Sequence, residues 1–162
     1  MSDIMQAICE DNYLQIKKLI KDGIDINDII ENEDNENDEC LMFYAIHKKC
    51  SLETLKLMVE NGFDIEFTDE HGVSLLDEAI VLGNVEFVTY LLDEKNINPN
   101  QTKRKSGLTP LMQASCYGKV DLVKLLIARG GDINVKDNLN LTAVDYARKL
   151  QRKKMQEFLE SL

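Results

Sequence analysis

The stretch with the strongest structural signal in this chain is Gly107-Leu108-Thr109-Pro110-Leu111-Met112-Gln113-Ala114-Ser115-Cys116-Tyr117-Gly118. Thr109 can cap a helix N-terminus, and Pro110 suits the first helical position because its missing N–H needs no partner there. Gly118 breaks this helix, and the apolar spacing from Val120 to Ile127 predicts a second one. The stretch therefore predicts two consecutive helices joined by a tight turn.

The same arrangement recurs along the chain. The apolar residue at the place of Leu111 returns at a nearly constant interval: Met42, Leu76, Leu111 and Val144. An alanine follows each by three positions: Ala45, Ala79, Ala114 and Ala147. Such a small residue predicts a close approach between the first helices of neighbouring units. Internal periods of this length are typical of solenoid proteins.

This pattern resembles the ankyrin repeat, whose consensus runs G-x-T-P-L-H-x-A-A-x-x-G, then V-x-x-L-L, then G-A-D-x-N. The third part is seen in residues 23–27, 62–66 and 130–134. The consensus His is replaced by Asp77, Met112 and Asp145, and the two aspartates stand three residues after the expected caps Ser74 and Thr142.

The resemblance covers the chain as five units: 1–38, 39–70, 71–104, 105–138 and 139–162. It implies an all-α ankyrin-repeat solenoid, one domain of stacked helix-turn-helix units with short β-hairpin-like connections. The first and last units would be the caps.

Composition excludes several classes of protein. The chain has 162 residues with 19 Lys and Arg against 29 Asp and Glu, a net charge of −10, which disfavours a nucleic-acid binder. No apolar run reaches the roughly 20 residues that a membrane span needs. The N-terminus does not look like a secretory signal. The four cysteines are widely spaced, so we expect reduced thiols and a cytoplasmic location.

The charge is unevenly distributed. Residues 1–102 hold 7 Lys and Arg against 23 Asp and Glu, whereas residues 103–162 hold 12 against 6. We expect a monomer in which this asymmetry permits weak, salt-dependent self-association. The acidic stretch 31–39 is expected to be a solvated loop, with a weak ion site or a contact for a basic partner as alternatives.

Little in the sequence indicates catalysis. There are two histidines and no phosphate-binding loop or nucleophile motif. Asp77 and Glu78 are adjacent, and adjacent helical side chains diverge, so they make a poor acid–base pair. We expect no enzyme activity and no cofactor. One alternative is a haem or metal held by His47, His71, Cys116 or Tyr117, which are side chains of ligating types.

The resemblance implies protein–protein recognition on a rigid concave surface. The expected contact residues are apolar groups at hairpin tips and in the last turns of first helices: Val73, Val81, Leu82, Leu108, Cys116, Tyr117, Leu139 and Leu141. The expected polar rim comprises Glu70, His71, Lys103, Arg104, Lys105 and Asn138. Two alternatives stay open: an accessory or inhibitory protein for one enzyme, handling its cofactor, and a secreted effector.

Overall fold

A computed structural model describes residues 2–30 and 39–162, and over these ranges the chain contains ten helices. It divides into two compact units, Met1–Phe67 and Thr68–Leu162, each described here by itself. The all-α prediction is confirmed, while the single domain stays a prediction. Within the two described ranges, no helix combines the length and apolarity needed to cross a membrane.

The described part of unit 1 contains two helix pairs and a short antiparallel ladder: α1 (Asp3–Cys9), α2 (Tyr13–Lys21), β1 (Ile29–Ile30), β2 (Glu39–Cys40), α3 (Leu41–His47) and α4 (Leu52–Glu60). The first helices α1 and α3 pack together, and so do the second helices α2 and α4. Residues 31–38 of the expected acidic loop lie outside the described residues.

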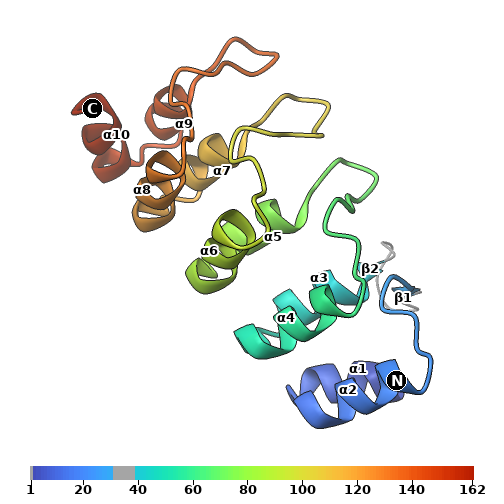
Figure 1. Ribbon diagram of the computed structural model, residues 1–162. Coiled ribbons are helices and arrows are strands. Elements are labelled where there is room, and N and C mark those ends of the chain that lie inside the picture. Colours follow the sequence, from blue (N-terminus) through green and yellow to red (C-terminus); the bar gives the residue numbers. More distant parts are fainter. Residues whose placement is uncertain (1, 31–38) are drawn as a thin grey trace. The chain divides into compact units, whose positions relative to one another are not determined.

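Unit 2 contains three helix pairs: α5 (Leu75–Leu82), α6 (Val85–Asp93), α7 (Pro110–Cys116), α8 (Val120–Ala128), α9 (Ala143–Lys149) and α10 (Lys153–Glu160). Helix α7 packs between α5 and α9, and α6 packs against α8 (Figure 1). Each pair is preceded by a hairpin that projects beyond the N-terminal ends of the first helices (Figure 1).

The predicted alanines lie where first helices meet. In unit 2, Ala79, Ala114 and Ala147 have no exposed surface. In unit 1, Ala45 is equally buried, and Ala7 is 3% exposed. A larger side chain at these places would hold the helices apart, because protein interiors are close-packed. The periodic alanine therefore sets the distance between repeats.

The helix caps also follow the sequence prediction. The hydroxyls of Ser74, Thr109 and Thr142 each accept a hydrogen bond from the third residue of their helix. In α3 this place is taken by Cys40, whose Sγ accepts from the Phe43 N–H at 3.4 Å. Burial raises the pKa of Cys40 to about 11, so it caps as a neutral thiol. The sequence analysis did not predict this cap.

An asparagine at the end of the Gly-x-Asp-Ile-Asn phrase, or of its degenerate copy at 96–100, joins two of the repeats to the repeat that follows. The Asn100 Nδ2 donates to the Gly130 carbonyl at 2.8 Å, and the Asp132 N–H donates to Asn100 Oδ1 at 2.8 Å. In unit 1, Asn27 bonds Gly62 and Asp64 in the same way. One asparagine side chain thus satisfies two backbone groups of the following repeat.

Neighbouring hairpins of unit 2 stack backbone against backbone. Gly72 has φ +77°, and a Cβ added there would lie 2.3 Å from the Lys103 carbonyl oxygen. Gly107 has φ +74°, and its added Cβ would lie 3.1 Å from Asn138 Oδ1. Both positions therefore need glycine for two reasons, the left-handed backbone and the close approach of the next hairpin.

Gly72→Ala tests the hairpin contact, with Gly130→Ala as its matched control. Gly130 has φ +93° and nothing within 4 Å of an added Cβ, so its alanine variant suffers backbone strain alone. We expect the free energy of unfolding to fall by about 1 kcal/mol for Gly130→Ala and by about 3 kcal/mol for Gly72→Ala. Urea denaturation measures both, and equal losses would contradict the hairpin contact.

Candidate protein-binding surface

The predicted apolar contact residues lie at two opposite ends of the first helices of unit 2. Val73, Leu108, Leu139 and Leu141 belong to the hairpin end, and Val81, Leu82, Cys116 and Tyr117 belong to the C-terminal end. Helix α7 has seven residues, which corresponds to about 10 Å between its ends. The predicted surface is therefore divided into two clusters.

Exposure separates the members further. At the hairpin end Val73 is buried, which corrects the expectation that it faces solvent. Its side chain precedes the cap Ser74 and packs inward, whereas Leu139 is 70% exposed and Leu108 and Leu141 are half-buried. At the C-terminal end Leu82 and Tyr117 are exposed, and Val81 and Cys116 are half-buried.

Three exposed apolar residues occupy one equivalent position in successive repeats of unit 2. They are Leu82 at 38%, Tyr117 at 50% and Leu150 at 49% exposure. Each directly precedes a residue with positive φ, namely Gly83, Gly118 and Gln151. We call Leu82, Tyr117 and Leu150 the helix-end row.

Leu150 is not among the contact residues predicted from the sequence, although the repeat interval identifies it as the counterpart of Tyr117. The same position in unit 1 holds Glu10 and Lys48, which are charged and exposed. Apolar character at this position is therefore confined to the repeats of unit 2.

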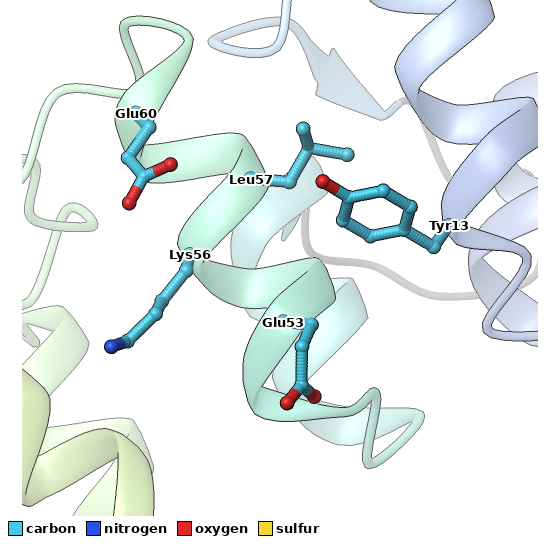
Figure 2. Close-up of a pocket in the computed structure, with 5 residues that line it drawn as sticks. All are labelled: Tyr13, Glu53, Lys56, Leu57 and Glu60. Carbon is cyan, nitrogen blue, oxygen red and sulfur yellow. The ribbon is translucent and has the colours of Figure 1, made fainter.

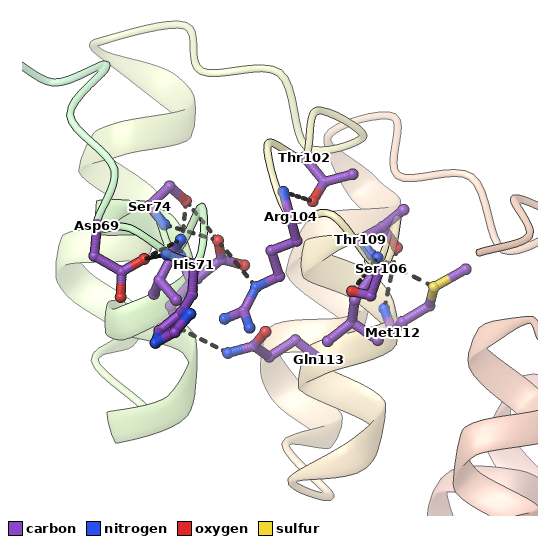
Figure 3. A network of polar contacts seen from close by, with 12 residues as sticks. Asp69, His71, Ser74, Thr102, Arg104, Ser106, Thr109, Met112 and Gln113 are labelled. Atoms are coloured by element: carbon purple, nitrogen blue, oxygen red, sulfur yellow. Dashed lines mark hydrogen bonds and ion pairs between the residues drawn. The ribbon is translucent and has the colours of Figure 1, made fainter. Parts of the chain in front are cut away.

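Most of the expected rim residues are exposed at the hairpin tips: Glu70, His71, Lys103, Lys105 and Asn138. Asn138 also has an internal role, because its Nδ2 donates to the Lys105 carbonyl. Arg104 was also expected in the exposed rim, and this prediction is wrong. Its side chain is only 19% exposed, and its Nε lies 3.6 Å from Asp77 Oδ2 (Figure 3).

The sequence of the hairpin explains why Arg104 turns inward. In the flanking hairpins its position is held by Asp69 and Asp137, and Oδ1 of each accepts two backbone N–H bonds that close the turn. Arginine has no acceptor. In this hairpin the Ser106 hydroxyl accepts from the Leu108 N–H, the counterpart of one of those two bonds, and the Thr102 hydroxyl accepts from the N–H of Arg104 itself (Figure 3). The guanidinium pairs with Asp77.

Asp77 and Asp145 play the same capping part in different surroundings. Burial raises the pKa of Asp77, although hydrogen bonds from Ser74 and the Arg104 charge oppose the rise. The pKa of Asp145 is lowered, chiefly by the hydrogen bonds from Thr142. The Asp77 side chain is 3% exposed and that of Asp145 is 32% exposed, so the cost of desolvation decides the direction of each shift.

The ligand-type residues of unit 2 are not brought together. His71 lies at a hairpin tip, with Nε2 3.5 Å from Glu70 Oε1, whereas Cys116 and Tyr117 lie at the far end of α7. His47 belongs to unit 1 and pairs with Glu39. Among the residues that the structure describes, no group of three or more His, Cys, Asp or Glu is placed to hold a metal ion.

The four cysteines are free thiols in different surroundings. Cys40 and Cys50 are buried in unit 1, Cys116 of unit 2 is half-buried, and Cys9 is exposed. Burial is the main cause that raises the pKa of Cys50 to about 12. A thiol with so high a pKa is a poor nucleophile at neutral pH.

Unit 1 has one further feature, a hollow of about 450 Å³ on its second helices (Figure 2). Tyr13 of α2 faces Leu57 of α4 across it, and Glu53, Lys56 and Glu60 line the rest. Charges of both signs surround the hollow, so it shows no preference for the charge of a ligand.

The opposite pKa shifts of the two capping aspartates predict opposite pH dependence. Asp145 contributes stability above the ordinary pKa of about 4, and this is lost as the pH falls. Ionised Asp77 instead lowers stability as the pH rises above about 4. Relative to wild type, Asp77→Asn should therefore gain stability with rising pH and Asp145→Asn should lose it.

Urea denaturation between about pH 3 and pH 7 checks both variants. The two aspartates are matched controls for each other, since each completes a capping box. Parallel pH slopes would contradict the assigned role of burial.

Comparison with known proteins agrees with the geometry of the helix pairs. Two family models match the chain: the one described as "Ankyrin repeats (3 copies)" covers residues 4–103, and the one described as "Ankyrin repeats (many copies)" covers residues 91–147. The E3 ubiquitin-protein ligase hecd-1 of Caenorhabditis elegans is 38% identical over 105 residues, which is 64% of this chain and 4% of that protein.

Two other relatives are similarly partial matches. Ankyrin repeat protein OPG189 of Variola virus is 33% identical over 92 residues, 56% of this chain and 16% of that protein. Alpha-latrotoxin-Lg1a of Latrodectus geometricus is 29% identical over 132 residues, 80% of this chain and 10% of that protein. The chain thus spans a small part of each relative's length. With its helix pairs, caps and repeat interval, the chain belongs to the ankyrin repeat family.

Proposed function

We propose that this protein binds another protein through the helix-end row of unit 2. Ankyrin repeats are generally protein–protein interaction modules, and their fold is non-catalytic. The observation that supports this surface is the recurrence of an exposed apolar side chain at one position in three successive repeats. Single exposed apolar residues are common on protein surfaces, but helix packing does not explain why one recurs at the same position of three successive repeats.

The scaffold beneath the row favours rigid recognition. Each member sits at the end of a first helix whose alanine is fully buried against its neighbour. Val81 and Cys116 extend the apolar surface as half-buried neighbours. A surface held in this way loses little conformational entropy when a partner binds, which favours affinity. The hairpin-end residues, including exposed Leu139, form a second and smaller candidate contact.

We also propose a cytoplasmic location, for which the four free thiols are the support. Free buried cysteines suit a reducing compartment, and Cys40 caps α3 through its thiol.

The double variant Leu82→Ala, Tyr117→Ala tests the surface. Both side chains are exposed, so we expect the thermal unfolding curve to remain nearly unchanged while partner capture is lost. Affinity purification from lysate with wild-type and variant baits, read by mass spectrometry, identifies the proteins that depend on the row. Leu14→Ala, on the 76% exposed Leu14 of unit 1, is the control bait. An identical set of partners for all three baits would overturn the proposal.

Self-association is a separate prediction from the charge distribution. Residues 1–102 hold 7 Lys and Arg against 23 Asp and Glu, and residues 103–162 hold 12 against 6, so an acidic part of one chain can attract the basic part of another. Electrostatic attraction between exposed charges extends over about 30 Å at 0.01 M salt but only about 3 Å at 1 M salt, where counterions screen it. Sedimentation velocity should therefore show a higher mean mass at the lower salt concentration. The same monomeric mass at both would contradict this expectation.

A further inference from the structure

Two basic side chains, those of Lys119 and Arg152, lie beside the helix-end row. Lys119 and Arg152 are the N-cap residues of α8 and α10. A Cβ added to Gly83 would lie 3.0 Å from Lys119 Nζ, and one added to Gly118 would lie 3.5 Å from Arg152 Cδ. Each cation therefore lies against the turn that follows the apolar residue of the preceding repeat. Along the row, apolar and basic groups alternate: Leu82, Lys119, Tyr117, Arg152 and Leu150.

The two cations are unexpected at helix N-termini. The N-cap residues of the second helices α2, α4 and α6 are Asn12, Ser51 and Asn84, whose side chains accept a backbone N–H bond. Lysine and arginine have no acceptor, and Lys119 and Arg152 make no such bond. Their charge also opposes the positive end of the helix dipole. These positions are therefore poorly explained by helix stability alone.

One internal hydrogen bond explains in part why an arginine stands at position 152. Its Nε donates to the Cys116 carbonyl at 3.0 Å, where a cation suits the C-terminal end of α7. This contact uses one of the five N–H donors of the guanidinium. Arg152 is exposed, so the other donors lie in a side chain that a partner can approach.

The charge around the row is mixed but mainly positive. Three exposed lysines surround its α9–α10 end: Lys149, Lys153 and Lys154. Two carboxylates, Glu86 and Asp121, lie in the first turns of α6 and α8. The row is thus most basic beside Tyr117 and Leu150, in a chain whose net charge is −10.

Resting on the proposed function, we infer that the partner supplies an acidic segment whose carboxylates pair with Lys119 and Arg152 while its apolar side chains cover Leu82, Tyr117 and Leu150. Carboxylates form strong charge-assisted hydrogen bonds with such cations, and the uncapped N–H groups of α8 and α10 lie beside them.

The spacing of the repeats limits the size of this segment. Helices α5, α7 and α9 are packed neighbours, and packed helices lie about 8–10 Å apart. The row therefore spans about 20 Å, which about six residues of extended chain would cover. The charge complementarity and this short span favour a linear segment of a separate protein over a large flat interface.

Selection from a library of random peptides on the immobilised 162-residue chain tests this inference. The peptides should be about twice as long as the row requires, and fluorescence polarisation then gives the affinity of those enriched. We expect enriched peptides to combine apolar residues with more Asp and Glu than the starting library. The variant Lys119→Gln, Arg152→Gln should weaken their binding by about tenfold or more.

Three further variants make the result specific. Lys136→Gln removes an exposed cation from the hairpin end and should leave peptide affinity unchanged. Arg152→Lys keeps the charge and should retain most of the binding. Leu82→Ala, Tyr117→Ala should abolish it. Melting curves followed by circular dichroism show whether each variant is folded.

The possible results separate the two proposals. Peptides that need Leu82 and Tyr117 but show no acidic excess, or bind the double Gln variant equally well, would overturn the acidic segment and leave the proposed function intact. Peptides indifferent to Leu82 and Tyr117, or a failure to enrich any peptide, would overturn both. Self-association of the chain that is lost in Leu82→Ala, Tyr117→Ala would make a second copy the occupant, against the inference.

Discussion

The close packing of first helices at the alanine positions is the contact on which the rest of the structure depends. Because Ala79, Ala114 and Ala147 are fully buried, α5, α7 and α9 lie in direct contact. That distance allows one asparagine to bridge two repeats and brings neighbouring hairpins into backbone contact. It also places the helix-end row on fixed supports. The candidate surface is thus a consequence of repeat packing and not of a flexible loop.

Unit 2 also shows how a repeat tolerates a departure from its own pattern. Arg104 replaces the aspartate that closes the flanking hairpins, and the Ser106 hydroxyl takes over one of the two backbone N–H bonds that the aspartate would accept. The displaced charge then pairs with Asp77, itself a substitute for the consensus His. Two departures from the repeat pattern are therefore coupled through one ion pair.

Much of the fold could be predicted from the sequence because local chemistry determines it. Thr109 and Gly118 each act over a few residues, and the alanines are recognised by their constant interval; the structure confirms all of them. The candidate surface was harder to predict, because the exposure of a side chain depends on residues that are distant in sequence and close in space. Val73 could not be distinguished from an exposed hairpin residue, and Arg104 could not be assigned Asp77 as its partner. Leu150 was accessible to sequence reasoning, since the repeat interval leads from Tyr117 directly to it.

The placement of the cysteines has a practical consequence. Cys50 is buried in unit 1 and Cys116 is half-buried in unit 2. An alkylating reagent therefore reaches each thiol fully only when the residues around it unfold locally. The chain therefore carries natural reporters of local unfolding, one in each half of its sequence. Modification rates resolved by mass spectrometry would compare the opening of the two units without any engineered label.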